Sequence, residues 1–230
     1  MENAPREAFV EAHPVESASA MAGPLLLRTD DLCDGPDPIP NPGPWLISAI
    51  AAEARIMTPA GPCPAGRLVP GDSVQTLDHG PCRLLWCGRR TITAAQVAAR
   101  REVGAISVPA HAFSGGSPRR ALRLSPRAGV LMLPDGAPRN GVLVPARDLL
   151  GHAGIAPAQA ATVTYVQLLL ERHAIFAADG LLVESFHPGW LGEGPTDSRL
   201  RAEVLEVLPE LEHGLDLYGR EVRLRAERAR

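Results

Sequence analysis

Four cysteines and seven histidines are the side chains of this chain best suited to bind a metal ion. Cys63, His79, Cys82 and Cys87 would together make a Cys3His set, which many structural zinc sites use. Their spacing argues against such a site, because on a strand over residues 81–88 Cys82 and Cys87 point to opposite faces. We therefore expect no metal and no other cofactor, and we interpret the cysteines as small buried apolar residues.

Other catalytic patterns are missing from this sequence. It contains no Gly-x-Ser-x-Gly element, no phosphate-binding Gly-x-x-x-x-Gly-Lys loop and no His-Glu-x-x-His helix. All 23 basic residues are arginines, which excludes Schiff-base chemistry on a lysine. The net charge of -3 gives no field that would attract nucleic acid or anionic lipid, so we expect neither as a partner.

The pattern of strands and turns defines the elements that must position any site. Short β-compatible runs, separated by Pro, Gly and Asp, predict an all-β body. Helical or irregular insertions are expected at residues 93–104 and 145–154. The expected strands lie in residues 54–58, 72–78, 83–88, 105–110, 121–125, 129–133, 141–146, 161–170 and 173–186.

Composition divides the chain into three parts. Residues 1–44 form a lead-in that ends in five prolines between Asp34 and Pro44, where neither a helix nor a β-ladder can continue. Residues 45–189 form the β body. Residues 190–230 are charged, with apolar residues at helical spacing, and predict one or two surface helices interrupted near Pro209 and Gly214. The arginines at the end of this part are interpreted as a solvated helix face: Arg220, Arg223, Arg225, Arg228 and Arg230.

The compartment is predicted from the termini and the cysteines. The acidic N-terminus lacks the basic and apolar layout of a secretory signal, and no apolar run reaches the roughly 18 to 20 residues that span a bilayer. We expect a soluble cytoplasmic protein with reduced thiols and no membrane association.

Six stretches together resemble a bacterial branch of the hedgehog/intein (Hint) domain family, in order and spacing. The resemblance covers roughly residues 45–189 and implies an all-β horseshoe of short antiparallel strands, followed here by a helical C-terminal appendage. The stretches are ARIMTPAG, AGRLVPGDSVQTLDHG, RLLWCGRRTI, LRLSPRAGVLM, GVLVPARDLL and VTYVQLLLERHAIFAADGLLVESFHPG.

The resemblance implies which residues would cut the chain. In the family, the first residue (Cys, Ser or Thr) attacks the carbonyl of the residue before it, and a Thr/Ser-x-x-His element binds the scissile amide and protonates its nitrogen. Counting back from Thr58, the nucleophile position falls on Ala49. The second element falls on Ser125 to Ala128, where alanine replaces the histidine. Both the nucleophile and the proton donor are therefore absent.

Two residues could replace the missing groups. Ser48 precedes the expected position by one residue and could attack the carbonyl of Ile47, although it also fits a polar residue on a half-buried strand. His173 could stand in for the imidazole, although it also fits a turn between two strands. Two functions remain open. One is a Hint module that has lost self-processing and serves as a binding or structural unit for a protein partner; the other is a self-cleaving or splicing domain that uses Ser48.

Overall fold

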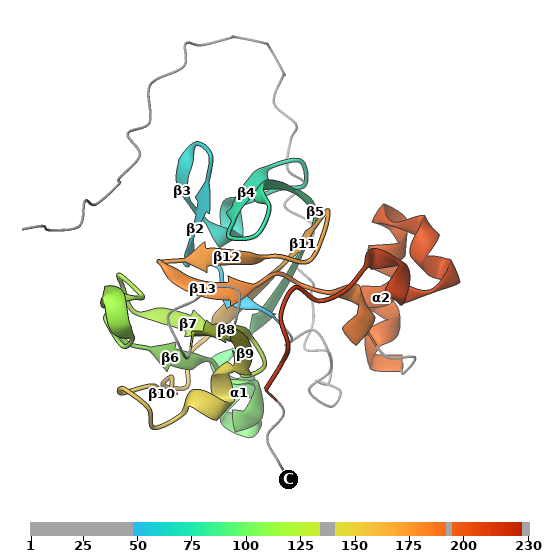
Figure 1. Cartoon of the computed structure of the whole chain (residues 1–230). Coiled ribbons are helices and arrows are strands. Elements are labelled where there is room, and N and C mark those ends of the chain that lie inside the picture. The colour runs from blue at the N-terminus through green and yellow to red at the C-terminus, as the bar shows by residue number, and fades with distance from the viewer. Residues whose placement is uncertain (1–47, 134–140, 192–194, 227–230) are drawn as a thin grey trace, which may run out of the picture. The chain divides into compact units, whose positions relative to one another are not determined.

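The computed structural model describes residues 48–133, 141–191 and 195–226. The predicted lead-in, residues 1–44, lies outside the described residues. The described strands run from β1 to β13, and the helix α1 (Ala94–Ala99) lies between β5 and β6 (Figure 1). Consecutive strands pair with each other in β2–β3, β4–β5, β6–β7, β8–β9 and β12–β13. The strands are β1 (Ile50–Ala51), β2 (Arg55–Thr58), β3 (Gly61–Pro64), β4 (Ser73–Thr76), β5 (Gly80–Ile92), β6 (Ile106–Val108), β7 (Leu122–Leu124), β8 (Gly129–Met132), β9 (Val142–Pro145), β10 (Ala156–Pro157), β11 (Val163–Leu170), β12 (Ile175–Ala178) and β13 (Leu181–Glu184).

The strands pair in one antiparallel sheet in the order β10-β6-β7-β1-β11-β5-β4-β12-β13-β8-β9, with the β2–β3 hairpin attached to β12. β5 and β11 form its longest ladder, from Val163 opposite Ile92 to Leu170 opposite Leu84. β4 follows a turn at Pro70 and Gly71, in which the Asp72 N–H donates to the Val69 carbonyl (3.1 Å). The all-β fold class predicted from the sequence is confirmed.

The main core lies where β2, β4, β5, β8, β11 and β12 meet, and it contains Ile56, Val74, Leu84 and Phe176. A second cluster packs Tyr165 and Ile92 against Val97 of α1 (Ala94–Ala99). Cys82 lies in the main core, and the half-buried Cys87 packs against the same core, whereas Trp86 belongs to a different cluster. The register of β5 against β11 shifts between the Leu169–Trp86 and Leu170–Leu84 pairs. This irregularity brings both cysteines to one face of β5, so the opposite orientation predicted from the strand period is wrong.

The C-terminal part begins as predicted and ends differently. α2 (Pro195–Val207) is followed by short 3-10 helices at Pro209–His213 and Leu215–Tyr218, so the helical stretch is interrupted near Pro209 and Gly214. The arginines after Gly219 are predicted to form a solvated helix face, and for residues 220–226 this is wrong; residues 227–230 lie outside the described residues. Residues 220–226 are not helical: the chain bends at Val222 and Arg223, and Arg225 bridges to Leu143 of β9 in a parallel arrangement. In Figure 1 this last described segment runs back from the helices toward β8 and β9.

Candidate functional site

Ala49 and Ser125 lie face to face at the start of β1 and the end of β7. The Ala49 N–H donates to Ser125 Oγ (3.2 Å), and the Ser125 N–H donates to the Ala49 carbonyl (2.9 Å). Both residues are completely buried. The structure thus brings together two of the residues selected from the sequence, and it places a hydroxyl oxygen on the amide that joins Ser48 to Ala49. The Ala49 methyl group carries no nucleophile.

The loop from Ser125 to Ala128 is fixed by backbone hydrogen bonds. The Ala128 N–H donates to the Ser125 carbonyl (3.1 Å), and the Ala146 N–H donates to the Ala128 carbonyl (2.9 Å). The methyl group of Ala128 is buried in the main core, whereas that of Ala49 belongs to the cluster around Tyr165. An imidazole at position 128 would therefore have to displace core side chains before it could approach Ala49.

Ser48, the alternative nucleophile, is buried and has a positive φ of 54°. Such a backbone conformation is unfavourable for a residue with a Cβ and is often found at functional sites. Its hydroxyl lies close enough to Glu184 to lower the pKa of that carboxyl, but the geometry is too poor for a well-formed hydrogen bond. Ser125 binds the amide of Ala49, which is one residue away from the amide that attack by Ser48 would break.

Glu184, at the end of β13, is the residue of this region that the sequence reasoning missed. Its carboxyl is buried, accepts a hydrogen bond from the Gly129 N–H (2.8 Å) and pairs with Arg225. Burial raises the pKa of Glu184 to about 7, although Arg225 opposes the shift. A Cβ at position 129 would clash with Glu184 Oε1, so the glycine leaves space for the carboxylate. A lone glutamate in the apolar run LLVESF was the available signal.

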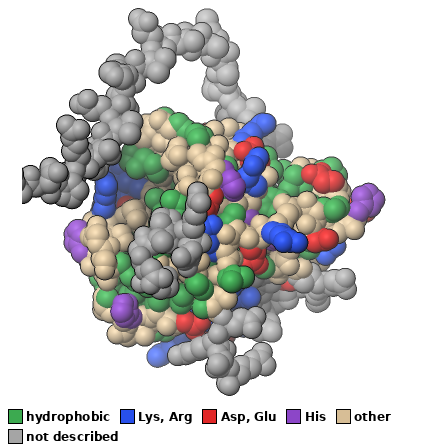
Figure 2. Space-filling model, in the orientation of Figure 1, with side chains coloured by type: hydrophobic (Ala, Val, Ile, Leu, Met, Phe, Trp, Pro, Cys, Tyr) green, Lys and Arg blue, Asp and Glu red, His purple; other side chains and the backbone are tan. Residues whose placement is uncertain are grey.

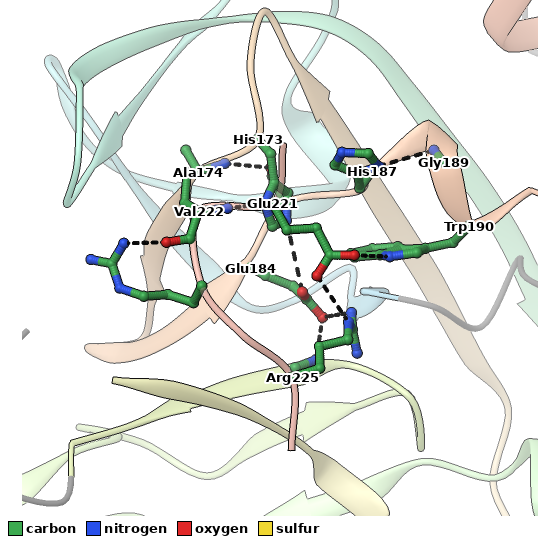
Figure 3. A network of polar contacts seen from close by, with 12 residues as sticks. His173, Ala174, Glu184, His187, Gly189, Trp190, Glu221, Val222 and Arg225 are labelled. Atoms are coloured by element: carbon green, nitrogen blue, oxygen red, sulfur yellow. Dashed lines mark hydrogen bonds and ion pairs between the residues drawn. The ribbon is translucent and has the colours of Figure 1, made fainter. Parts of the chain in front are cut away.

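His173 lies in a loop between β11 and β12, as predicted, but it is buried. Its Nδ1 accepts a hydrogen bond from the Val222 N–H (3.1 Å), and its Nε2 lies 3.7 Å from Glu184 Oε2 (Figure 3). Burial lowers the pKa of His173 to about 3, with His187 and Arg225 acting in the same direction. The imidazole is therefore neutral, and among the described residues no hydrogen bond joins it to Ser48 or Ala49.

The cysteines do not form a reactive or metal-binding group in the part of the chain that the structure describes. Cys63, Cys82 and Cys87 are free thiols, and no cluster of three His, Cys, Asp or Glu side chains occurs among these residues. Burial raises the pKa of Cys87 to about 11, so its thiol is protonated at neutral pH. His79 lies in the turn between β4 and β5, where its N–H donates to Thr76 Oγ1 (3.2 Å).

The pairing of the described strands in one antiparallel sheet defines an all-β protein. The family model of the Hint domain matches residues 48–190, which is more than half of the chain. The chain therefore belongs to the Hint domain family, as the sequence motifs predicted.

Solved structures similar to this chain include two inteins. The MchDnaB-1 intein is 14% identical, with 60% of this chain and 100% of the intein covered and a TM-score of 0.39. The gp41-1 intein is 11% identical, with 59% of this chain and 96% of the intein covered and a TM-score of 0.35. A search of curated proteins found no match. In the described part of the chain, no helix has the length and apolar character needed to cross a membrane.

Proposed function

We propose that this Hint domain does not cut its own chain and serves as a protein-binding unit, without a cofactor. One observation carries the proposal: Ser125 binds the amide of Ala49, yet position 49 has no nucleophile and position 128 has no proton donor. An amide leaves slowly unless its nitrogen is protonated, and attack requires a nucleophile fixed beside the carbonyl. A cytoplasmic location with reduced thiols agrees with the free cysteines and forms part of the same proposal.

The test is the intact mass of the purified chain after incubation with dithiothreitol. We expect the full-length mass to persist for days at neutral pH, with and without thiol. The matched control is the Ser48→Ala variant, which should behave identically. A fragment that begins at Ser48 or Ala49 in the parent chain would contradict the proposal.

A second candidate function is cleavage between Ile47 and Ser48 by the Ser48 hydroxyl. The positive φ of Ser48 and its buried hydroxyl, which has no well-formed hydrogen bond, favour this candidate. The position of Ser125 on the Ala49 amide and the neutral His173 speak against it. Intact mass distinguishes the two functions. A fragment that begins at Ser48 in the parent chain and does not form in the Ser48→Ala variant would identify Ser48 as the nucleophile.

A further inference from the structure

The described residues after Gly219 form a tail segment, residues 220–226, that binds the edge of the sheet. β9 is the last strand in the sheet order, and its free edge receives this segment. The Leu143 N–H donates to the Leu224 carbonyl (2.8 Å), and the Ala226 N–H donates to the Leu143 carbonyl (2.8 Å). These two hydrogen bonds make one parallel bridge between Arg225 and Leu143, and main-chain pairing of this kind is how peptides add to an exposed strand edge.

Two arginines of the tail segment reach carboxylates of the Hint domain. Arg223 donates to Asp78 Oδ1 (2.6 Å) in the turn after β4, and Arg225 pairs with the buried Glu184. Leu224, which lies between them, is 81% exposed, so the domain does not contact its side chain extensively. Val222 packs beside the apolar cluster of β8, β9 and β12, and its N–H is bound by His173. The domain therefore contacts an aliphatic residue (Val222) and two arginines (Arg223 and Arg225) separated by one residue, which is the pattern aliphatic-Arg-x-Arg.

Trp190 completes the site around Arg225. Its indole N–H donates to Glu221 Oε1 (2.6 Å), and the Arg225 guanidinium lies 4.2 Å from the centre of its ring (Figure 3). Cation–π contacts of this kind favour a guanidinium group. Basic and acidic side chains are interspersed on the face shown in Figure 2, so the specificity comes from the individual pairs rather than from a uniform field.

Asp78, His173, Glu184 and Trp190, which contact the tail segment, lie within residues 48–190, whereas the segment itself lies outside that range. We propose that the β9 edge, with Asp78, Glu184 and His173, is a peptide-binding site for an aliphatic-Arg-x-Arg segment of a partner protein. The chain's own residues 222–225 occupy it until such a segment displaces them. This deepens the proposed binding function and rests on it.

The chemistry of Glu184 explains why the partner segment must carry arginine. If Arg225 leaves, the buried carboxyl retains the Gly129 N–H as a donor but loses its counter-charge, which is costly. A second guanidinium in the same position restores the pair. Because Gly129 directly follows the Ser125 to Ala128 loop, the peptide site and the candidate Hint site share this carboxyl.

The first experiment measures the binding of a labelled peptide, GREVRLRA (residues 219–226), by fluorescence anisotropy. A tethered segment competes at an effective concentration of roughly millimolar, so the parent chain should bind the free peptide weakly. The full-length variant Arg223→Ala/Arg225→Ala should bind it at least about tenfold more tightly, because its own tail competes less. The Leu224→Ala peptide should bind like the parent peptide, and an Arg223→Ala/Arg225→Ala peptide should lose binding. Adding Asp78→Asn to the chain should weaken binding.

A second measurement uses the parent chain and does not depend on how well the variant folds. Excess peptide should accelerate hydrogen exchange at the amide of Ala226, whereas the Leu143 amide should stay protected because the incoming strand replaces the tail. Unchanged exchange at Ala226 in millimolar peptide would overturn the proposal. So would peptide binding that is indifferent to the two arginines. Intact mass recorded on the same samples tests the lack of self-cleavage separately, because a cleaved chain would refute the proposed function whatever the peptide does.

Discussion

Ser125 and Ala49 bind each other through two hydrogen bonds, although 76 residues separate them in the chain. The pair joins the first strand of the described domain to the loop after β7 and holds the peptide bond between Ser48 and Ala49 in a buried position. The amide of residue 49 is therefore bound by a hydroxyl group although residue 49 itself carries no nucleophile.

The Ser125→Ala variant should lose about 1–3 kcal/mol of unfolding free energy, because the Ala49 N–H would remain buried without its hydroxyl acceptor. Urea unfolding measures this loss. Ser107 in β6 offers a matched control, since it is a half-buried strand serine, and Ser107→Ala should change stability by less than about 0.5 kcal/mol. Equal effects in the two variants would mean that the Ser125 hydroxyl adds nothing to stability.

The pKa shifts of Glu184 and His173 predict opposite dependences of stability on pH. The pKa of Glu184 is raised from 4.5 to about 7, so between these pH values the folded state binds more protons than the unfolded state. The free energy of unfolding that Glu184 contributes is therefore lost as pH rises through this range. The pKa of His173 is lowered from 6.5 to about 3, so the unfolded state binds the extra proton and stability is lost as pH falls below 6.5. Between pH 4.5 and 6.5 the two effects nearly cancel.

Replacing Glu184 removes its contribution to the pH dependence of stability and leaves that of His173. The Glu184→Gln variant should lose stability as pH falls from 6.5 to 4.5 more steeply than the parent, by up to about 1.4 kcal/mol per pH unit. Urea unfolding at several pH values gives the two slopes, and Glu210→Gln, at an exposed position, is the control. Parallel slopes for Glu184→Gln and the parent would show that Glu184 takes up no proton in this range.

The turn before β4 depends on the backbone conformation of Gly71. Gly71 has a φ of 100° with no atom near an added Cβ, so a substitution is penalised by backbone conformation rather than by a clash. Gly71→Val should cost about 1–3 kcal/mol and lower the melting temperature. Gly71→Asn should cost less, because asparagine tolerates a positive φ more readily. A Val variant that melts no earlier than the Asn variant would contradict this account.

A structural feature can be predicted from the sequence when the residues that determine it lie close together in the chain. Turn residues such as Gly71 and Gly80 act within a few positions, so most strands and the interruptions at Pro209 and Gly214 were predictable. The tail segment was not, because its non-helical path depends on partners far along the chain: Asp78 lies 145 residues from Arg223, and Glu184 lies 41 residues from Arg225. Without these partners, the local spacing of apolar and charged residues indicates a helix. Glu184 was overlooked for the same reason, since nothing beside it in the sequence marks its counter-charge.

Restoring the missing groups tests whether Ala49 and Ala128 occupy the nucleophile and proton-donor positions. In the double variant Ala49→Cys/Ala128→His, the new thiol can add to the Ser48 carbonyl. If the imidazole displaces the core side chains that surround position 128, it can protonate the departing amide nitrogen, and a thioester forms. Dithiothreitol then releases residues 1–48. Neither single variant should cleave, because attack and departure are both required and such residues act as a unit.

The measurement is intact mass during incubation with thiol, and melting curves show which variants are folded. Ala128 is buried in the main core, so the imidazole at this position is expected to lower stability by about 1–3 kcal/mol. This cost is the same in the Ala128→His single variant, which is therefore the matched control for folding. Cleavage between positions 48 and 49 in the double variant alone would place both groups at one reaction centre. A folded double variant that stays intact for days would mean that Ala128, whose methyl group packs in a different cluster from that of Ala49, no longer faces the scissile amide.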